Sequence, residues 1–532
     1  MEKRKILLPL WIGLALAGGV FIGSKLNFGD TAEKIFATNS KKDKLNRLID
    51  YIEYEYVDKV NTDSIVDVTV NGILENLDPH SVYIPKGQYA QAADDMRGAF
   101  IGIGVSFYIY KDTIAVIRPI PGGPAEVAGI KAGDRIIYAD GNKLFGDNVE
   151  RDSITNYLKG EINSRVALQV YRPSEDKVLN LKLRRKQVPI ISVDASFKLS
   201  DDLGYIKINR FSETTFKEFE IALKKLKKEG ITKLVLDLRN NPGGYVSTAE
   251  RVVDEFLENN KLVLITKNKN GDISKTYSTR RGDFENGQLY VLINENSASA
   301  SEIVAGALQD NDIGTIVGRR SFGKGLVQRE MSLGDGSAIR LTIARYYTPT
   351  GRSIQRPYGK GNDTYYRDYE KRYRNGELLH ADSIKVADSL KFLTPKGKVV
   401  YGGGGIIPDV FVPKDTSVEN ETLQYVSRSG FMSYFIFEYL DRNRALFNEI
   451  SFKDFRDNYQ VSEELAQEFI EYARLNEAQI DLSRYASELK RTLKANIAQQ
   501  LFGPNEYEKI LNQSDPMILK VLEIESRNQP IK

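Results

Sequence analysis

The stretch Asn296–Gln328, NSASASEIVAGALQDNDIGTIVGRRSFGKGLVQ, carries the residues around which the rest of the chain is organised. It opens with three alternating serines, Ser297, Ser299 and Ser301, in front of apolar residues at helical spacing. A short apolar strand follows, and then Lys324 stands between two glycines. A serine at the mouth of a helix and an isolated lysine are the pair expected of a hydrolase with a serine nucleophile and a lysine base.

Each of these two residues also has an ordinary structural interpretation. Ser299 followed by Glu302 fits the S-x-x-E capping box of a helix N-terminus, and a lysine such as Lys324 is most often solvated at the surface. The composition favours the catalytic interpretation, because the chain has no cysteine and only two histidines to form another nucleophile–base pair. Gln328 lies four residues after Lys324, a spacing that predicts both side chains on one face of a strand.

SASASE followed by FGKGLVQ resembles the C-terminal processing peptidases, also called tail-specific proteases. The resemblance implies that Ser299 is the nucleophile, that Lys324 is the general base, and that Gln328 orients the lysine. It also implies a mixed α/β fold, with a crotonase-like protease core, an inserted PDZ domain and helical amino- and carboxyl-terminal regions. It covers about 40–355 and 400–413 and is weak beyond them.

The chemistry requires an uncharged amine on Lys324. A free lysine has a pKa of ~10.4 and is charged at neutral pH, so it cannot accept a proton. Burial disfavours the ammonium form and lowers the pKa by up to ~3–5 units. We therefore expect Lys324 to be buried and to face Ser299, with no carboxylate beside its amine.

A turn upstream supplies the expected oxyanion hole. The apolar run LVLDL is typical of a central strand covered on both faces, and NNPGG at residues 240–244 follows it before a new helix. Backbone amides at such a turn are well placed to stabilise an oxyanion. By the resemblance this turn supplies one donor and Ala300 supplies the other. Gly243 and Gly244 both fit the first role, and Gly244 is preferred.

From Gly98 the pattern changes to short strands joined by glycine turns, and PAEVAGIKAGDRI at 124–136 is similar to bacterial PDZ domains. Such domains add a peptide tail as a strand to a sheet edge and bind its terminal carboxylate through backbone amides. The GIGV stretch at the start of this region resembles their carboxylate loop, although its glycines also fit a plain hairpin. The residues expected to bind the tail are Gly102, Ile103, Gly104 and Val105.

The amino terminus has a targeting pattern. Residues 3–5 are basic and precede an uncharged apolar run from Ile6 to Gly23, which is near the lower limit for a membrane-spanning helix. We favour an uncleaved anchor over a cleaved signal, because no small-residue cleavage site stands out after Gly23. The basic residues would stay in the cytoplasm. The rest would then work in the cell envelope, on the periplasmic side of the inner membrane.

The amino-acid composition limits the classes of molecule that the protein is expected to bind. The net charge is +3, from 75 basic and 72 acidic residues, which argues against nucleic-acid binding. The absence of cysteine excludes disulfides and thiolate metal sites, and the motifs call for no metal or cofactor. The expected partners are protein substrates with free, unstructured C-termini and, through the amino-terminal segment, the membrane. A homo-oligomer formed through the helical tail stays open.

Two segments are less readily interpreted. LDPHS at 77–81 resembles a structural turn of the same family, so His80 is expected to be a packed or hydrogen-bonded turn residue rather than a base. A polar, tyrosine-rich insert at about 357–395, which contains His380, interrupts a stretch that also resembles the family. This insert fits either a solvated helix or loop, or a lid or partner surface, and the sequence does not choose between them.

The leading hypothesis is a membrane-tethered serine endopeptidase that cleaves polypeptides near their C-termini. The alternative is a non-catalytic PDZ scaffold or chaperone with a decayed protease core. A trypsin-like protease is excluded because the chain has no G-x-S-G-G turn. The expected organisation is a signal anchor at 1–28, a helical region at 29–97, a PDZ domain at 98–186, a protease core at 187–415 and a helical domain at 416–532.

Overall fold

A computed structural model of the protein describes residues 40–146, 151–359, 361–447, 449–476, 482 and 485–528. The chain separates into two compact units, with the boundary between Asn76 and Leu77. The described part of the first unit consists of helices α4 (Ser40–Glu55) and α5 (Thr62–Glu75). The expected anchor at 1–28 lies outside the described residues. Within the described ranges, no helix combines the length and apolarity needed to cross a membrane.

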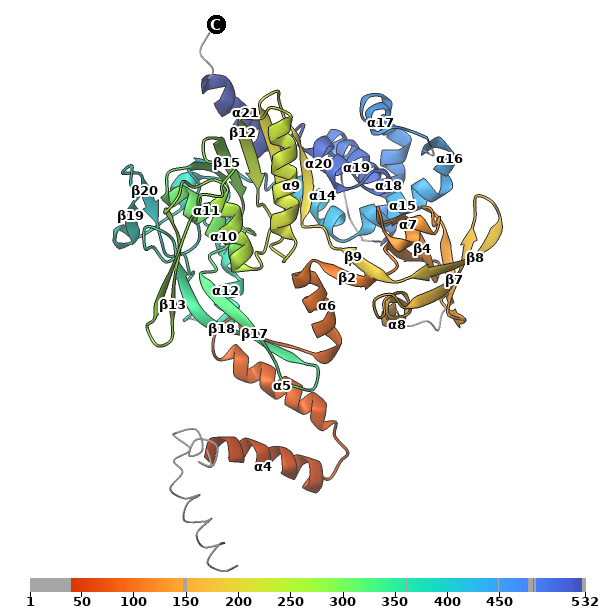
Figure 1. The fold of residues 1–532 in the computed structure, drawn as a ribbon, viewed down its shortest axis with the longest axis horizontal. Helices are drawn as coiled ribbons and strands as arrows, with labels where there is room; N and C mark the ends of the chain where they lie inside the picture. The colour runs from red at the N-terminus through yellow and green to blue at the C-terminus, as the bar shows by residue number, and fades with distance from the viewer. Residues whose placement is uncertain are drawn as a thin grey trace, which may run out of the picture. The chain divides into compact units, whose positions relative to one another are not determined.

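The protease region is built on a six-stranded sheet in the order β10-β11-β12-β15-β16-β21, parallel except for β10. Figure 1 labels its strands β12 and β15 and the helices α9, α10 and α11 of the same region. Helices α9, α10 and α11 connect its successive parallel strands. The bounds are β10 (Val193–Lys198), β11 (Leu203–Ile208), α9 (Thr215–Lys228), β12 (Lys233–Asp237), α10 (Val246–Asp254), β15 (Gln288–Ile293), α11 (Ala300–Asp310), β16 (Gly314–Gly318) and β21 (Val410–Phe411).

Both faces of this sheet are covered. Side chains alternate along a strand, so Leu234 and Leu236 of β12 point to the same face of the sheet. There they pack into the core shared with α9, α10 and α11. Val235, between them, packs on the opposite face against Ile518 and Val521 of α21 (Pro516–Asn528). The continuous apolar run of β12 thus forms the central strand that the sequence predicts.

A second sheet brings a remote segment to the site. Its order is β1-β18-β13-β14, with β17 also paired to β18. β1 follows the 77–81 turn and runs antiparallel to β18, with Val82 opposite Arg340. The turn therefore lies close to the strand that carries Gln328. The bounds are β1 (Val82–Ile84), β13 (Leu262–Asn268), β14 (Ile273–Tyr277), β17 (Leu326–Ser332) and β18 (Ala338–Tyr347).

Between helix α6 (Lys86–Arg97) and β10, the chain forms a separate small sheet in the order β3-β4-β5-β7-β8, with β6 paired to β5. β3 is an edge strand, and β2 pairs separately with β9. The bounds are β2 (Ala99–Gly102), β3 (Val105–Tyr110), β4 (Thr113–Pro119), α7 (Pro124–Val127), β5 (Arg135–Ala139), β6 (Asn142–Lys143), α8 (Arg151–Leu158), β7 (Arg165–Arg172), β8 (Lys177–Arg184) and β9 (Lys186–Pro189).

After β18 the insert contains α12 (Asn362–Tyr366), α13 (Asp368–Arg374), two 3-10 turns (Ala381–Ser383 and Asp388–Leu390) and β19 (Lys391–Leu393), which pairs with β20 (Val399–Tyr401). The elements after β21 are helices, as the sequence predicts for this region, and Leu489, Leu493 and Ile497 lie in their shared core. These helices are α14 (Val418–Arg428), α15 (Phe431–Arg442), α16 (Arg444–Phe447), α17 (Phe452–Asn458), α18 (Glu463–Asn476), α19 (Ala486–Leu501), α20 (Pro504–Leu511) and α21.

Candidate active site

The predicted site lies where the loops after β12 and β15 meet. These are neighbouring parallel strands, whose carboxyl ends form the usual position for a ligand site in such a sheet. Asn241 joins the two loops, because its carbonyl oxygen accepts hydrogen bonds from Ala298 N and Ser301 Oγ, both at 3.0 Å. The NNPGG turn and the SASAS segment are therefore held together by two hydrogen bonds to one main-chain carbonyl.

The three serines of SASAS have different environments. Ser297 and Ser301 are fully buried, and their hydroxyls donate to the carbonyl oxygens of Leu238 (2.8 Å) and Asn241 (3.0 Å). Ser299 is partly exposed and precedes α11 with φ 54° and ψ −112°. A non-glycine residue rarely adopts this conformation, and such strain clusters at functional sites. The environments therefore favour the middle serine as the reactive one.

Glu302 links the serine to the lysine segment. Its buried carboxylate accepts from Ser299 N at 2.9 Å, as a capping box requires, but also from Gly323 N at 2.7 Å and Lys324 N at 2.8 Å. Ser321 Oγ is a fourth donor, at 2.5 Å. Burial raises the pKa of Glu302, while these four donors act in the opposite direction. The structural interpretation of S-x-x-E is thus correct, and the same carboxylate also fixes the lysine loop.

The amine of Lys324 is largely buried and donates to Gln328 Oε1 at 2.7 Å. Among the described residues, no carboxylate lies within the 4 Å of an ion pair with this amine. Burial lowers the pKa of Lys324 to about 8, the Arg340 charge acts in the same direction, and Glu302 and Asp78 oppose it. A lysine with this pKa is uncharged in about a tenth of the molecules at pH 7, a fraction several hundred times that of an ordinary lysine.

The position of Lys324 differs from the strand-face prediction. Lys324 precedes β17, and the strand has a bulge between Val327 and Gln328, so the even spacing does not place both residues on one regular face. The two side chains meet because the loop and the bulge bring them together. The amine of Lys324 is hydrogen-bonded to Gln328 and not to Ser299 in this structure.

His80 is a turn residue, as the sequence predicts. Its carbonyl oxygen accepts a hydrogen bond from Gln328 Nε2, and its Nε2 lies 2.7 Å from the hydroxyl of Tyr365 in the insert. Burial, followed by the nearby Lys324 charge, lowers the pKa of His80 to about 4. The ring is therefore neutral at physiological pH. His380, the other histidine, lies in the insert just before a 3-10 turn.

The two candidate glycines face different neighbours. The Gly243 amide is already bound, because it donates to Asn241 Oδ1 at 2.8 Å. In the described part of the chain, the amides of Gly244 and Ala300 have no hydrogen-bond partner. Gly243 itself lies against Ser299, so an added Cβ would come within 2.8 Å of Ser299 Cβ. This geometry favours Gly244 and Ala300 as oxyanion donors.

A cavity of about 620 Å³ opens beside Lys324. Its lining includes the side chain of Arg428, at the end of α14, which sequence reasoning did not place at the site. Arg428 follows the lysine by more than a hundred residues, and no local pattern connects the two. The other lining residues are His80, Asn240, Pro242, Asn296, Ala298 and Phe322. Within the described ranges, no group of three or more acidic and histidine side chains is arranged to hold a metal ion.

The predicted carboxylate loop lies at the start of the edge strand. Gly102 ends β2 and Val105 begins β3. Ile103 is buried in the core of this small domain, and its carbonyl oxygen accepts from Ala125 N at 2.8 Å. Gly104 has φ 75°, a value that favours glycine.

Comparisons with known proteins match the protease region, the small domain before β10 and the carboxyl-terminal helices. Residues 202–364 match the model of peptidase family S41, 102–183 match the PDZ domain, and 422–503 match a family of unknown function (DUF8443). The carboxy-terminal processing protease CtpB of Bacillus subtilis is 33% identical over 371 residues, which cover 66% of this chain and 76% of that relative. This chain belongs to peptidase family S41, the carboxy-terminal processing proteases.

A second S41 relative, the carboxy-terminal-processing protease of Bartonella bacilliformis, is 34% identical over 347 residues, 63% of this chain and 78% of the relative. The solved structure of a photosystem II D1 C-terminal processing protease is 26% identical, covers 70% of this chain and 86% of its own, and has a TM-score of 0.35. The chain is thus a serine peptidase of mixed α/β structure with a PDZ domain, as the motifs indicated.

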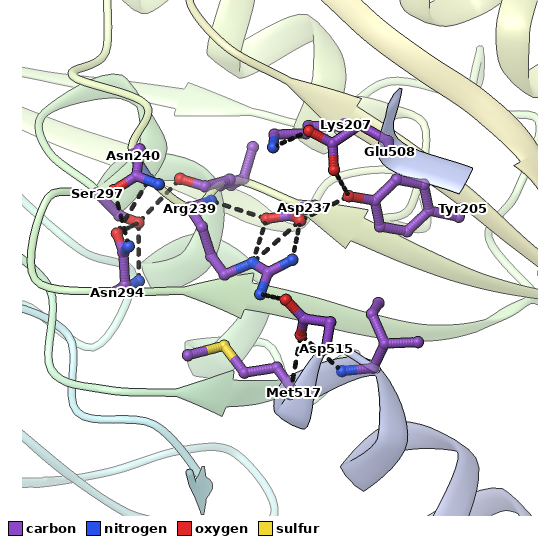
Figure 2. A network of polar contacts seen from close by, with 12 residues as sticks. Tyr205, Lys207, Asp237, Arg239, Asn240, Asn294, Ser297, Glu508, Asp515 and Met517 are labelled. Atoms are coloured by element: carbon purple, nitrogen blue, oxygen red, sulfur yellow. Dashed lines mark hydrogen bonds and ion pairs between the residues drawn. The ribbon is translucent and has the colours of Figure 1, made fainter. Parts of the chain in front are cut away.

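The carboxyl-terminal helices of this S41 peptidase support the NNPGG turn (Figure 2). Arg239, which precedes the turn, forms a bidentate ion pair with Asp237 and a second pair with Asp515 at 2.6 Å. Burial alone would raise the pKa of Asp237, but the Arg239 guanidinium holds it below the ordinary value. Tyr205 also donates to Asp237, at 2.7 Å. The residue before helix α21 is therefore connected to the NNPGG turn through partly buried charges.

Proposed function

We propose that this protein is an endopeptidase with a Ser299–Lys324 catalytic dyad, housed in a crotonase-like core, that cleaves polypeptides near their C-termini. The observation that carries the proposal is the buried Lys324 amine, which is hydrogen-bonded to an amide and not to a carboxylate. Its pKa of about 8 suits a base that must be uncharged near neutral pH.

In the proposed reaction, Ser299 Oγ attacks the scissile carbonyl carbon and its proton passes to Lys324 Nζ. The amides of Gly244 and Ala300 stabilise the negative oxygen of the tetrahedral intermediate. The C–N bond then breaks, and the lysine ammonium donates its proton to the leaving amine. A water molecule, deprotonated by the same lysine, then attacks the acyl carbonyl carbon; the bond from that carbon to Ser299 Oγ breaks, and the lysine ammonium returns the proton to Ser299 Oγ as the new carboxyl end leaves.

Substrate capture by the PDZ domain is the second part of the proposal. β3 is an edge strand, and an extended tail adds to such an edge through main-chain hydrogen bonds. Gly102, Ile103, Gly104 and Val105 would bind the terminal carboxylate at its start. Substrates would then be proteins with free, unstructured C-termini.

We also propose that the apolar run 6–23 anchors the enzyme in the inner membrane, with the catalytic part on the periplasmic side. The basic residues 3–5 support this orientation. Fractionation of cells expressing the full chain tests it: the protein should remain in the membrane fraction at high salt and enter the soluble fraction after residues 1–28 are deleted. Recovery of the intact chain in the soluble fraction would contradict it.

The catalytic proposal is tested with purified protein and an unstructured polypeptide that has a free tail. Ser299→Ala and Lys324→Ala should each reduce cleavage at least ~10³-fold, while tail binding measured by fluorescence anisotropy is unchanged. Amidation of the terminal carboxylate should weaken binding to the wild-type protein. A wild-type protein that binds the tail without cutting it would instead favour the scaffold or chaperone alternative.

A further inference from the structure

The insert reaches the segment next to the base. Tyr365 of α12 is buried, 2% exposed, and its hydroxyl lies 2.7 Å from His80 Nε2, with the two rings packed edge to face. The hydroxyl of the adjacent Tyr366 donates to the carbonyl oxygen of Pro79. Two consecutive tyrosines of the insert therefore hold two consecutive residues of the 77–81 turn.

The turn is rigid on its other side as well. Asp78 accepts hydrogen bonds from His80 N at 2.8 Å, Ser81 N at 2.9 Å and Ser81 Oγ at 2.7 Å. The His80 carbonyl oxygen is therefore fixed in space. This oxygen accepts from Gln328 Nε2, while Gln328 Oε1 accepts from Lys324 Nζ at 2.7 Å.

Tyr365 of the insert also packs with Arg356 and Phe322 beside this chain of contacts. The guanidinium of Arg356 lies 3.9 Å from the centre of the Tyr365 ring and 4.4 Å from that of Phe322, two residues before Lys324. Asp368 of α13 holds this guanidinium by an ion pair of 2.7 Å. The rings and the arginine form a cover over the side of the turn that faces the insert.

We propose that the insert is a brace for the general base, in which Tyr365 positions the amine of Lys324 through His80 and Gln328. The inference rests on the proposed function, because it assigns the base role to Lys324. Tyr365 is a positioning residue, since it touches His80 and not the reacting atoms. The insert is then neither a solvated loop nor only a partner surface.

The effect of these contacts on Lys324 can be measured through the pH dependence of activity, because charged groups surround them. Arg340, Glu302 and Asp78 act on Lys324, and Asp78, Arg356 and Lys324 act on His80. The pKa of His80 is about 4, so its ring stays neutral over the range in which Lys324, with a pKa of about 8, loses its proton. Loosening the brace admits water to the amine, and the pKa of Lys324 then moves up toward its ordinary value.

The test is Tyr365→Phe, which removes the hydroxyl and keeps the ring. The rising limb of kcat/KM with pH should move upward by ~0.5–1 unit. At pH 7, kcat should fall ~3–10-fold and recover at pH 9.5, with KM unchanged. Tyr369→Phe is the matched control, because that hydroxyl lies in the same insert but contacts Lys414; its pH profile should be that of the wild type.

His80→Phe and a Tyr365→Phe/Gln328→Ala double variant complete the test. His80→Phe should produce the same upward shift, and the double variant should lose little more than Gln328→Ala alone, because the two residues act in series. An unshifted profile in both single variants, or equal loss at every pH, would overturn the inference. The proposed function fails separately, if Ser299→Ala or Lys324→Ala retains wild-type activity.

Discussion

At the scale of single residues, Lys324 occupies a position where its charged form destabilises the folded protein. Lys324 lies in a largely buried position with no carboxylate partner in the part of the chain that the structure describes, so the folded protein disfavours its charged form. The pKa falls from the ordinary 10.5 to about 8, which means that the unfolded chain binds more protons between these values. Stability therefore increases as pH rises through this range, and at neutral pH the lysine reduces it.

Lys324→Met removes the buried amine and should stabilise the folded protein while abolishing cleavage. The fall in the pKa of Lys324 from 10.5 to about 8 sets an upper limit of ~3 kcal/mol on the gain in free energy of unfolding. Loss of the Gln328 hydrogen bond reduces this gain to roughly 1–2 kcal/mol at pH 7. Denaturant unfolding of both proteins at pH 7 and pH 10.5 measures it. The gain should shrink at the higher pH, and a variant less stable than the wild type at pH 7 would contradict the account.

Glu302→Gln tests the carboxylate that holds both the Ser299 segment and the Lys324 loop. The glutamine amide has one acceptor oxygen, while the carboxylate of Glu302 receives four donors, so at least one donor would face an NH₂ group. We expect a loss of roughly 2–4 kcal/mol of stability and a fall in kcat of at least ~10-fold. Thermal unfolding and steady-state kinetics measure the two effects. Retention of full activity would show that Glu302 does not position the lysine loop.

Residues that share a motif were predictable, and residues that meet only in the fold were not. Ser299 and Lys324 stand in recognisable local patterns within one stretch, so the candidate dyad could be proposed from the sequence. Tyr365 is 285 positions from His80, and Arg428 lines the pocket beside Lys324 from the end of α14, more than a hundred residues later in the chain. No periodicity or spacing in the sequence relates such pairs, because the fold alone brings them together.

At the scale of elements, the NNPGG turn is held by a residue at the start of a helix far along the chain. Asp515 pairs with Arg239 at 2.6 Å, and its other oxygen accepts from Met517 N at 2.9 Å and Ile518 N at 3.1 Å at the start of α21. One carboxylate thus caps the helix and holds the arginine that precedes the turn. The apolar pattern of β12 predicted a central strand, but not which helix would cover its second face.

Asp515→Ala should remove both contacts and Asp515→Asn only the charge, because asparagine is an equally good helix cap. We expect the alanine variant to lose about 2–4 kcal/mol and the asparagine variant about half as much. Both should lower kcat more than they raise KM, since Asn240 and Gly244 lie in the turn that Arg239 supports. Urea unfolding and kinetics measure this. An asparagine variant as stable as the wild type would show that the charge of Asp515 contributes nothing, and equal stability of the two variants would show that its helix cap contributes nothing.

At the scale of the whole catalytic unit, the PDZ domain is held by the carboxyl-terminal helices. Phe437 of α15 is 1% exposed, and its ring centre lies 5.5 Å from those of both Tyr108 and Tyr110 on the edge strand β3. Arg135 of β5 lies over the Phe437 ring at 5.8 Å and pairs with Asp441 at 2.5 Å. The outer face of the PDZ sheet is therefore an interface within the chain.

Phe437→Ala should loosen this interface without disturbing the protease core. Truncating a buried aromatic side chain costs ~3–5 kcal/mol of stability. Here the loss weakens the contact between two domains, and each domain keeps its own core. Amide hydrogen exchange should accelerate in β3–β5 and in α15, and stay unchanged in α9–α11. Leu446→Ala on the neighbouring helix is the control, because Leu446 is 69% exposed. If exchange accelerates equally in α9–α11, the domains unfold as one unit and α15 does not act as a separable support for the PDZ sheet.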